Sequence, residues 1–387
     1  MKSIQIFRFA DPFKWFAAGV LTVSLAACGG GSDAPASTTT TLSASLSGDQ
    51  EPTPTVTGAL GTGTLSLTVP SRELSGSIAI NGMAANAAHV HLGDTGINGA
   101  IIVPLAETIS GSGIWAVPPG TVVTEAQAAA FGAGGLYFNA HSTENPGGEI
   151  RGQIGRQVLA AQLSAAQEVP GNATTATGNG LVSLDPATKK FTARLTLTGM
   201  TATAAHIHPG ALGVNGPVLF PLSETAAGSG VWVSASDAVL TDAQITLLNT
   251  GGLYFNAHST AFPGGQIRGQ IGLNVRFASL SAAQEVPPNA STATGTGTLV
   301  VNPATRAASG SIAIAGMTAT AAHIHLGATG VNGAIIVPLA NDGAGVWSVP
   351  ANSILTADQF KAYKQGNLYF NAHSVAYPGG EIRGQIR

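Results

Sequence analysis

The sequence predicts an all-β protein built from three tandem antiparallel β-sandwich or barrel domains, each with one short helix. A His-x-His motif begins at His89, His206 and His323, and successive copies lie 117 residues apart. Solenoid repeats are only about 20–50 residues long, whereas about 100–150 residues is the usual size of a domain. Each copy is therefore a domain, and the predicted domains are residues 42–156, 157–273 and 274–387.

The N-terminus is typical of a bacterial secretory signal. Lys2, Arg8 and Lys14 precede an apolar stretch at residues 15–27 that is too short to span a membrane. This stretch ends in Leu-Ala-Ala-Cys, which resembles a lipoprotein lipobox, and Cys28 is the only cysteine of the chain. The resemblance implies a signal peptide at residues 1–27 and lipidation at Cys28. A single cysteine also excludes an intrachain disulfide.

The segment after Cys28 predicts how the domains are displayed. Residues 28–41 are rich in Gly, Ser and Thr, which is typical of a flexible tether. Gly29 follows the cysteine where an inner-membrane retention signal would resemble Asp, so an outer-membrane destination is favoured. The expected localisation is the bacterial cell envelope, with the lipid anchor holding the chain to a membrane.

The composition excludes one class of partner. Only 9% of the residues are Asp, Glu, Lys or Arg, and the formal net charge is −3. An average soluble protein has about 25% charged residues, so Ser, Thr, Asn and Gly must cover most of the surface. The predicted mature chain has no basic run and no interleaved basic and aromatic residues. Nucleic-acid binding is therefore not expected.

Within one copy the apolar runs are short and typical of strands. In the third copy, residues 297–302 and 308–314 are separated by a Pro-containing turn, and residues 321–326 alternate apolar and polar side chains. Four further runs follow, at residues 334–339, 345–349, 367–373 and 380–386. Seven or eight short strands with Gly, Pro and Asn turns favour an antiparallel sandwich or barrel.

One helix is predicted in each copy. It begins at the sequences Thr-Glu-Ala-Gln (124–127), Thr-Asp-Ala-Gln (241–244) and Thr-Ala-Asp-Gln (356–359). Thr as the N-cap and Gln three residues later form a capping box, and the acidic residues of the first turn favour the helix dipole. Gly134, Gly251 and Gly366 then end the helices. A helix of about ten residues is unstable alone in water, so it must pack on the sheet.

All nine histidines fall in the repeated motif, where Asn-Ala-His-Ser follows His-x-His by about 50 residues. Because alternate residues of a strand share a face, His89 and His91 point the same way, as do Asn139 and His141. Pairing of these two strands would bring three imidazoles together. Three histidines with an open position can bind zinc, and imidazole also suits copper. The candidate ligands of zinc or copper are His89, His91, His141, His206, His208, His258, His323, His325 and His373.

A structural role for the same histidines is the alternative. Neutral imidazoles can hydrogen-bond carbonyl groups that would otherwise be buried without partners under the long loop. The asparagine beside the third histidine and the arginine of Ile-Arg-Gly-Gln complete a predicted structural polar network. Its members are Asn139, Arg151, Asn256, Arg268, Asn371 and Arg383. We expect each arginine to hold a neighbouring loop or a carboxylate.

Conventional hydrolase chemistry has little support in the sequence. The chain has no Gly-x-Ser-x-Gly motif, no thiol except Cys28, and no acid beside the histidines in every copy. Glu149 and Glu381 follow Pro-Gly-Gly, but the second copy has Gln266 there. A catalytic acid at that position would be lost in one copy of three. No catalytic residue is predicted, and the protein is expected not to be an enzyme.

The combined motifs resemble a known family. Ala-Ala-His-Ile-His, Asn-Gly, Tyr-Phe-Asn-Ala-His-Ser and Pro-Gly-Gly-Glu-Ile-Arg-Gly-Gln-Ile look like the CHRD domain, named after chordin, in three copies that cover nearly all of the chain beyond the tether. The resemblance implies an immunoglobulin-like β-sandwich or barrel in a secreted or surface protein. It implies growth-factor binding in the animal member and no defined activity in bacterial relatives. The departures are Gln50-Glu-Pro-Thr-Pro in the first copy, and Pro209 and Gln266 in the second.

The His-Val-His strand of the first copy also resembles copper–zinc superoxide dismutase, but the chain lacks the further histidines and the disulfide that this likeness implies. We therefore expect a cell-envelope lipoprotein that displays three CHRD domains as a non-enzymatic binding or structural module for a protein or surface ligand. The alternative is a zinc- or copper-binding protein, or a superoxide-dismutase-like metalloenzyme, that uses the histidine triplets.

Overall fold

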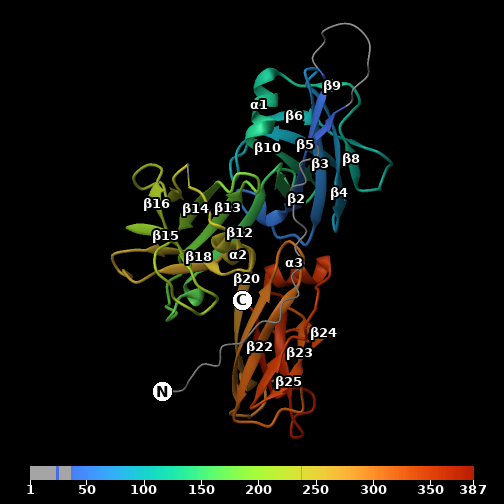
Figure 1. Cartoon of the computed structure of the whole chain (residues 1–387). Coiled ribbons are helices and arrows are strands. Elements are labelled where there is room, and N and C mark those ends of the chain that lie inside the picture. The colour runs from blue at the N-terminus through green and yellow to red at the C-terminus, as the bar shows by residue number, and fades with distance from the viewer. Residues whose placement is uncertain (1–22, 26–35, 237) are drawn as a thin grey trace.

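The computed structural model of the chain describes residues 23–25, 36–236 and 238–387. Cys28 and nearly all of the predicted signal peptide lie outside the described residues. The described chain forms three β-rich domains in tandem, each antiparallel and each with one α-helix, which confirms the predicted fold class (Figure 1). No helix in the described ranges has the length and apolar character needed to cross a membrane.

The first domain contains ten strands, one 3-10 turn and one α-helix. They are β2 (Thr38–Ser47), η1 (Gly48–Gln50), β3 (Leu60–Val69), β4 (Glu73–Asn81), β5 (Ala87–Leu92), β6 (Ile101–Pro104), β7 (Ala106–Glu107), β8 (Ile114–Ala116), β9 (Thr121–Val122), α1 (Glu125–Ala133), β10 (Leu136–His141) and β11 (Ile150–Gln153). A short strand that precedes the domain, β1 (Val23–Leu25), pairs with β2.

The second and third domains repeat this order. The second has β12 (Gln157–Ser164), η2 (Ala165–Gln167), β13 (Thr177–Leu184), β14 (Phe191–Thr198), β15 (Ala204–Pro209), β16 (Phe220–Glu224), β17 (Val231–Val233), α2 (Asp242–Asn249), β18 (Leu253–His258) and β19 (Ile267–Gln270). The third has β20 (Asn274–Ser281), η3 (Ala282–Gln284), β21 (Thr294–Val301), β22 (Ala308–Ala315), β23 (Ala321–Leu326), β24 (Ala334–Pro338), β25 (Ala340–Gly343), β26 (Val346–Ser348), α3 (Ala357–Gln365), β27 (Leu368–His373) and β28 (Ile382–Gln385).

Each domain is an antiparallel barrel. In the second domain the strands close fully, in the order β12-β13-β14-β17-β16-β15-β18-β19. The first domain has the order β6-β5-β10-β11-β2-β3-β4-β8-β7, with Leu105 alone between β6 and β7, so the chain itself completes the ring. The third domain follows the same path. Closure leaves few strand edges available for pairing with other chains.

The interior of each barrel is apolar because alternate strand residues face inward. In the first domain Leu65, Val90 and Phe138 are completely buried. Removing such a side chain from water contributes about 1.5–3 kcal/mol. The buried apolar residues form three separate clusters, one within each domain. Each domain therefore has its own core.

The helices begin as predicted from their capping boxes. The hydroxyls of Thr124, Thr241 and Thr356 each accept the N–H of the glutamine three residues later, which returns its side chain to the N-cap. Gly134 and Gly366 end α1 and α3 in the left-handed conformation, whereas α2 continues to Asn249 and ends at Thr250. Each helix packs against its barrel through buried apolar side chains, such as Phe131 and Leu248.

The structure differs from the sequence prediction at the tether. Strand β2 begins at Thr38, so the last four residues of the segment predicted as tether, 28–41, belong to the first barrel. The Thr39 hydroxyl lies 2.8 Å from that of Thr68, and the Thr41 hydroxyl lies 2.7 Å from that of Ser66. Threonine is β-branched and suits a paired strand. The other two domain starts, at 157 and 274, are the first residues of β12 and β20.

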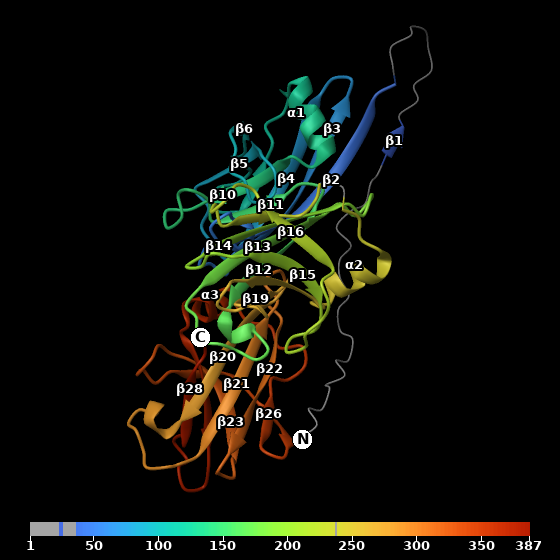
Figure 2. The same ribbon diagram turned by 90° about the vertical axis from the view of Figure 1, so that its left-hand side faces the viewer.

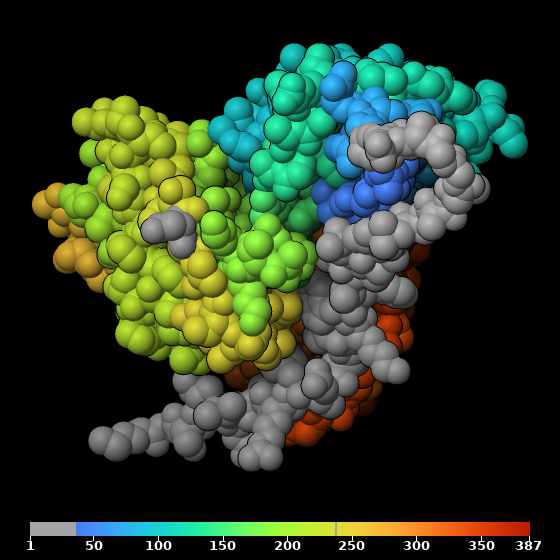
Figure 3. Space-filling model, turned by 45° about the horizontal axis from the view of Figure 1, so that its top comes forward, coloured from blue at the N-terminus to red at the C-terminus, as the bar shows by residue number. Residues whose placement is uncertain are grey.

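The three domains contact one another. Arg156, at the end of the first domain, forms an ion pair of 2.9 Å with Asp185 of the second. Figure 3 shows the surfaces of these two domains against each other. Helix α3 of the third domain lies where that domain meets the first (Figures 1 and 2).

Candidate metal centre

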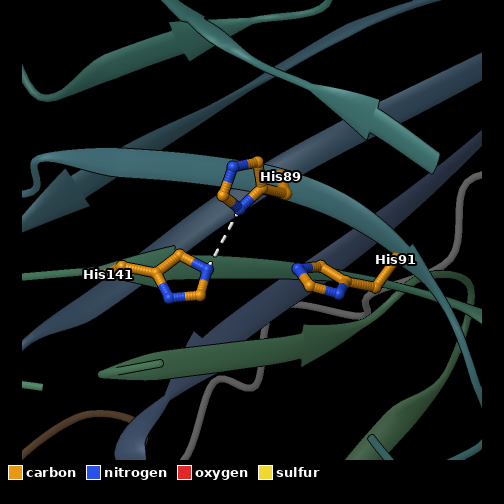
Figure 4. A group of neighbouring side chains, drawn as sticks. All are labelled: His89, His91 and His141. Atoms are coloured by element: carbon orange, nitrogen blue, oxygen red, sulfur yellow. Dashed lines mark hydrogen bonds between the residues drawn. The ribbon is translucent and has the colours of Figure 1, made fainter. Parts of the chain in front are cut away.

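The three histidines of each domain come together because two distant strands pair. Strands β5 and β10 are antiparallel, with His91 opposite Tyr137 and His89 opposite Asn139. Paired residues share a face of the sheet, so these side chains lie on the face opposite the apolar core, together with His141. Figure 4 shows the three rings turned toward one another.

One nitrogen atom of each histidine lies close enough to the other two for a single ion to bind all three after small movements of the side chains. His89 Nδ1 lies 3.1 Å from His141 Nε2, and His91 Nε2 is buried with no hydrogen-bond partner in the part of the chain that the structure describes. The potential ligand atoms all lie within 4.8 Å of one another. The same geometry recurs in the other two domains, at His206, His208 and His258 and at His323, His325 and His373.

Backbone carbonyls fix which nitrogen of two rings carries the proton. His91 Nδ1 lies 3.0 Å from Gly99 O, and His141 Nδ1 lies 3.0 Å from Pro146 O. A carbonyl only accepts, so both Nδ1 atoms must donate, and a neutral ring then has its lone pair on Nε2. The Nδ1 atoms thus serve the structural role, and the Nε2 atoms converge as metal ligands do. A metal ligand is commonly oriented by such a bond from its other nitrogen.

The surroundings favour the uncharged imidazole. Burial lowers the pKa of His89 and His91, and the neighbouring imidazoles lower it further. Burial also lowers the pKa of His206, His208, His258, His323 and His325. The neutral ring is the form that binds a metal ion.

A stack of three side chains makes the site rigid. The His91 ring stacks on Tyr137 with centroids 4.9 Å apart and an interplanar angle of 15°. The guanidinium carbon of Arg151 lies 3.4 Å from the centroid of the same tyrosine. The tyrosine hydroxyl accepts the N–H of Gly99, whose carbonyl holds His91. The equivalent stacks contain Tyr254 with Arg268 and Tyr369 with Arg383.

The arginines of the predicted polar network hold the loop after His-x-His. Arg151 donates to Ile97 O at 2.9 Å and to Asp94 O at 2.7 Å. Arg268 and Arg383 bind the same loop in their own domains. These carbonyl groups have no regular β-sheet partner, so the guanidinium replaces one. Of the two expected partners, a loop or a carboxylate, the hydrogen bonds go to the loop.

The asparagines of the network contact an acid that the sequence analysis missed. Asn256 Nδ2 lies 3.5 Å from Glu168 Oε2, and Asn371 Nδ2 lies 3.4 Å from Glu285 Oε2. Each domain therefore does carry an acid near its histidines. The acid contacts the asparagine that pairs with the first histidine across the two strands. The signal was present in the sequence, because Gln-Glu pairs at Glu51, Glu168 and Glu285 recur every 117 residues.

These acids are buried. Burial raises the pKa of Glu51 and of Glu168 to about 7, although Arg151 and Arg268 oppose the shift. The pKa of Glu285 is raised for the same reason. Among the described residues of each domain, one oxygen of the acid and the amide oxygen of the asparagine are buried without a donor. Protonation of the acid would supply one.

The Pro-Gly-Gly-Glu position has a structural role. The Thr57 hydroxyl donates to Glu149 Oε1 at 2.5 Å, and the Ser291 hydroxyl donates to Glu381 Oε1 at 2.6 Å. In the second domain Gln266 Nε2 makes the corresponding bond of 3.0 Å to Thr174. Glutamine can replace glutamate here because the partner is a hydroxyl, which both donates and accepts.

Comparison with known proteins agrees with the repeated geometry. The family model of the CHRD domain matches residues 42–154, 159–271 and 276–386. The chain belongs to the CHRD domain family. The three CHRD matches contain all nine histidines and the three stacked arginines. A search of curated proteins and a search of solved structures each found no match.

Proposed function

We propose that this protein is a cell-envelope lipoprotein whose three CHRD domains each bind one transition-metal ion, zinc or copper. The supporting observation is the convergence of three imidazole nitrogens in every domain, two of them with the lone pair directed inward by Nδ1 bonds to carbonyls. A purely structural role does not explain why, among the described residues, the Nε2 atoms of His91, His208 and His325 are buried with no hydrogen-bond partner.

The donor set defines the chemistry. Three neutral imidazoles suit zinc and copper, and leave a coordination position open. His89 Nδ1 donates to His141 Nε2. His89 would bind an ion through Nδ1, with its own proton on Nε2. In the part of the chain that the structure describes, no carboxylate or thiol joins these clusters. We therefore propose a non-enzymatic binding module, with a superoxide-dismutase-like metalloenzyme as the alternative.

The metal content of the protein tests this proposal. We expect the purified mature chain, equilibrated with Zn²⁺ or Cu²⁺ and then desalted, to retain close to three ions. The variant His206→Ala should retain two, because the second site loses a ligand. His206 is the best residue to replace, since among the described residues its side chain hydrogen-bonds only His258. The ions are measured by mass spectrometry.

The matched comparison is His208→Ala. His208 also holds Gly216 O at 3.0 Å, so its loss should lower the metal content and also destabilise the second domain by roughly 1–3 kcal/mol. His206→Ala should lower mainly the metal content. Retention of three ions by both variants, or of none by the unmodified chain, would contradict the metal proposal.

The lipobox-like Leu-Ala-Ala-Cys supports the anchoring part of the proposal. We expect Cys28→Ala to abolish lipid attachment, so the protein should keep its signal peptide or move from the membrane to the soluble fraction. A diacylated cysteine suffices for stable membrane attachment. Fractionation and intact mass measure this. Unchanged mass and unchanged membrane retention would be evidence against lipidation.

A further inference from the structure

Helix α3 of the third domain contacts the first domain through lysines. Lys364 Nζ lies 2.6 Å from Asp49 Oδ1, and the side chains are only 5% and 2% exposed. Lys361 Nζ lies 2.7 Å from Glu144 on the surface. A buried ion pair requires good geometry and further hydrogen bonds to offset its desolvation. Asp49 has such a bond, because Asn274 Nδ2 lies 3.1 Å from its Oδ2.

The backbones also fit closely at this contact. A Cβ on Gly58 of the first domain would lie 1.9 Å from the carbonyl oxygen of Ala357, in the first turn of α3. Arg306 of the third domain donates to Gly58 O at 3.4 Å. Only a glycine permits this approach. The contact is therefore packed as well as charged.

The three copies within one chain provide an internal comparison. The ion-paired residues of this contact occur only in the two domains that form it. At the positions of Lys361 and Lys364, α1 has Ala129 and Gly132, and α2 has Thr246 and Asn249. At the positions of Asp49 and Glu144, the other domains have Ala166, Ala261, Ala283 and Ala376. The two acids and the two lysines are thus found where the first and third domains meet, and the equivalent positions of the other copies carry no charge.

Helix α3 touches two segments beside the histidine cluster of the first domain, η1 and the loop after β10. Asp49 lies two residues before Glu51, the buried acid next to Asn139. Glu144 lies in the loop whose Pro146 carbonyl holds His141. In the same loop, a Cβ on Gly148 would lie 2.8 Å from Glu51 Oε1. The buried Lys364–Asp49 pair fixes η1 from outside, and the packing of Gly148 on Glu51 passes this restriction to the loop that holds His141. The exposed Lys361–Glu144 pair adds less.

We propose that α3 clamps the first histidine site, so that this site exchanges its metal ion more slowly than the second and third sites do. The clamp itself rests on the contacts above, and the difference in metal exchange rests on the proposed function. An ion leaves a three-histidine site by movement of a ligand, and a loop opens less often when a buried ion pair and a packed helix must separate first.

Amide hydrogen exchange of the full chain tests the clamp without metal. Residues 142–149 should exchange about tenfold more slowly than the equivalent residues 259–266 and 374–381. Two variants transplant residues that the other copies carry: Lys361→Thr with Lys364→Asn in α3, and Asp49→Ala with Glu144→Ala in the first domain. Both should make the three loops alike, while core amides stay protected and show that the domains remain folded.

Transfer of Zn²⁺ from the loaded protein to a chromophoric chelator tests the consequence. The unmodified chain should release one third of its ions in a slow phase, and both double variants should release all of them in one fast phase. Equal exchange of the three loops in the unmodified chain, or slow exchange that persists in both variants, would overturn the clamp. Absence of bound Zn²⁺ with the loop difference intact would instead contradict the proposed function.

Discussion

Replacing Arg268 with alanine is expected to destabilise the second domain by about 3–5 kcal/mol, because it removes a large buried side chain and leaves a buried carbonyl without its donor. The Arg268 side chain is completely buried. It donates to Val214 O at 3.0 Å and to Ala211 O at 2.8 Å, and it covers the Tyr254 ring. Without it, the Val214 carbonyl loses its donor, the Ala211 carbonyl keeps only the N–H of Val214, and the stack under His208 loses one side.

Calorimetry of the full chain measures this effect, because each domain has its own apolar core. A loss of this size should lower the melting temperature of one domain by more than about 10 °C, so the second domain should unfold in a separate, earlier transition. Lys190→Ala, an exposed cation in the same domain, is the control and should leave the profile unchanged. An unaltered profile for Arg268→Ala would contradict the role assigned to the arginine.

The barrel could be predicted because its signals are local and repeated. Strand alternation, the capping boxes and the 117-residue period all lie within short windows of the sequence. The convergence of His89, His91 and His141 needed one further assumption, that β5 and β10 pair, and the register of these strands confirms the pairing. Sequence alternation gives the face on which a side chain lies. It does not give the ring nitrogen that carries the proton, since that depends on Gly99 O and Pro146 O.

The acids were missed for a different reason. Glu168 and Asn256 are 88 residues apart, and no periodicity connects the turn after η2 with the middle of β18. The Gln-Glu pairs indicated only that the position matters in each copy. The chemical property of these acids depends on burial, because burial raises the pKa of a carboxyl group toward neutral pH.

The contact between the first and third domains could be predicted least. Asp49 and Lys364 are 315 residues apart, and only the arrangement of whole domains brings them together. A comparison of the repeats does mark both positions, because each has a charge that its two equivalents lack. Such differences between copies indicate contacts between copies, whereas features common to all three indicate the site and the core.

The raised pKa of Glu168 makes the stability of the second domain depend on pH. An acid with a folded-state pKa of about 7, against an ordinary value of 4.5, binds its proton more tightly when folded. Its contribution to stability is complete below about pH 4.5 and is lost as the pH rises through 7. The loss is at most about 3 kcal/mol, since each tenfold change in proton affinity corresponds to about 1.4 kcal/mol. The histidines act in the opposite sense, because a lowered pKa costs stability as the pH falls.

Glu168→Gln is therefore expected to stabilise the second domain by up to about 3 kcal/mol at pH 8, with little change at pH 5. The introduced glutamine cannot ionise, and its Nε2 can serve as a donor for Asn256 Oδ1, which has no partner among the described residues. The histidine contributions cancel when the variant and the unmodified chain are compared at the same pH. Urea unfolding at both pH values measures the difference. A stability difference that is the same at pH 5 and pH 8 would show that Glu168 is already ionised in the folded domain.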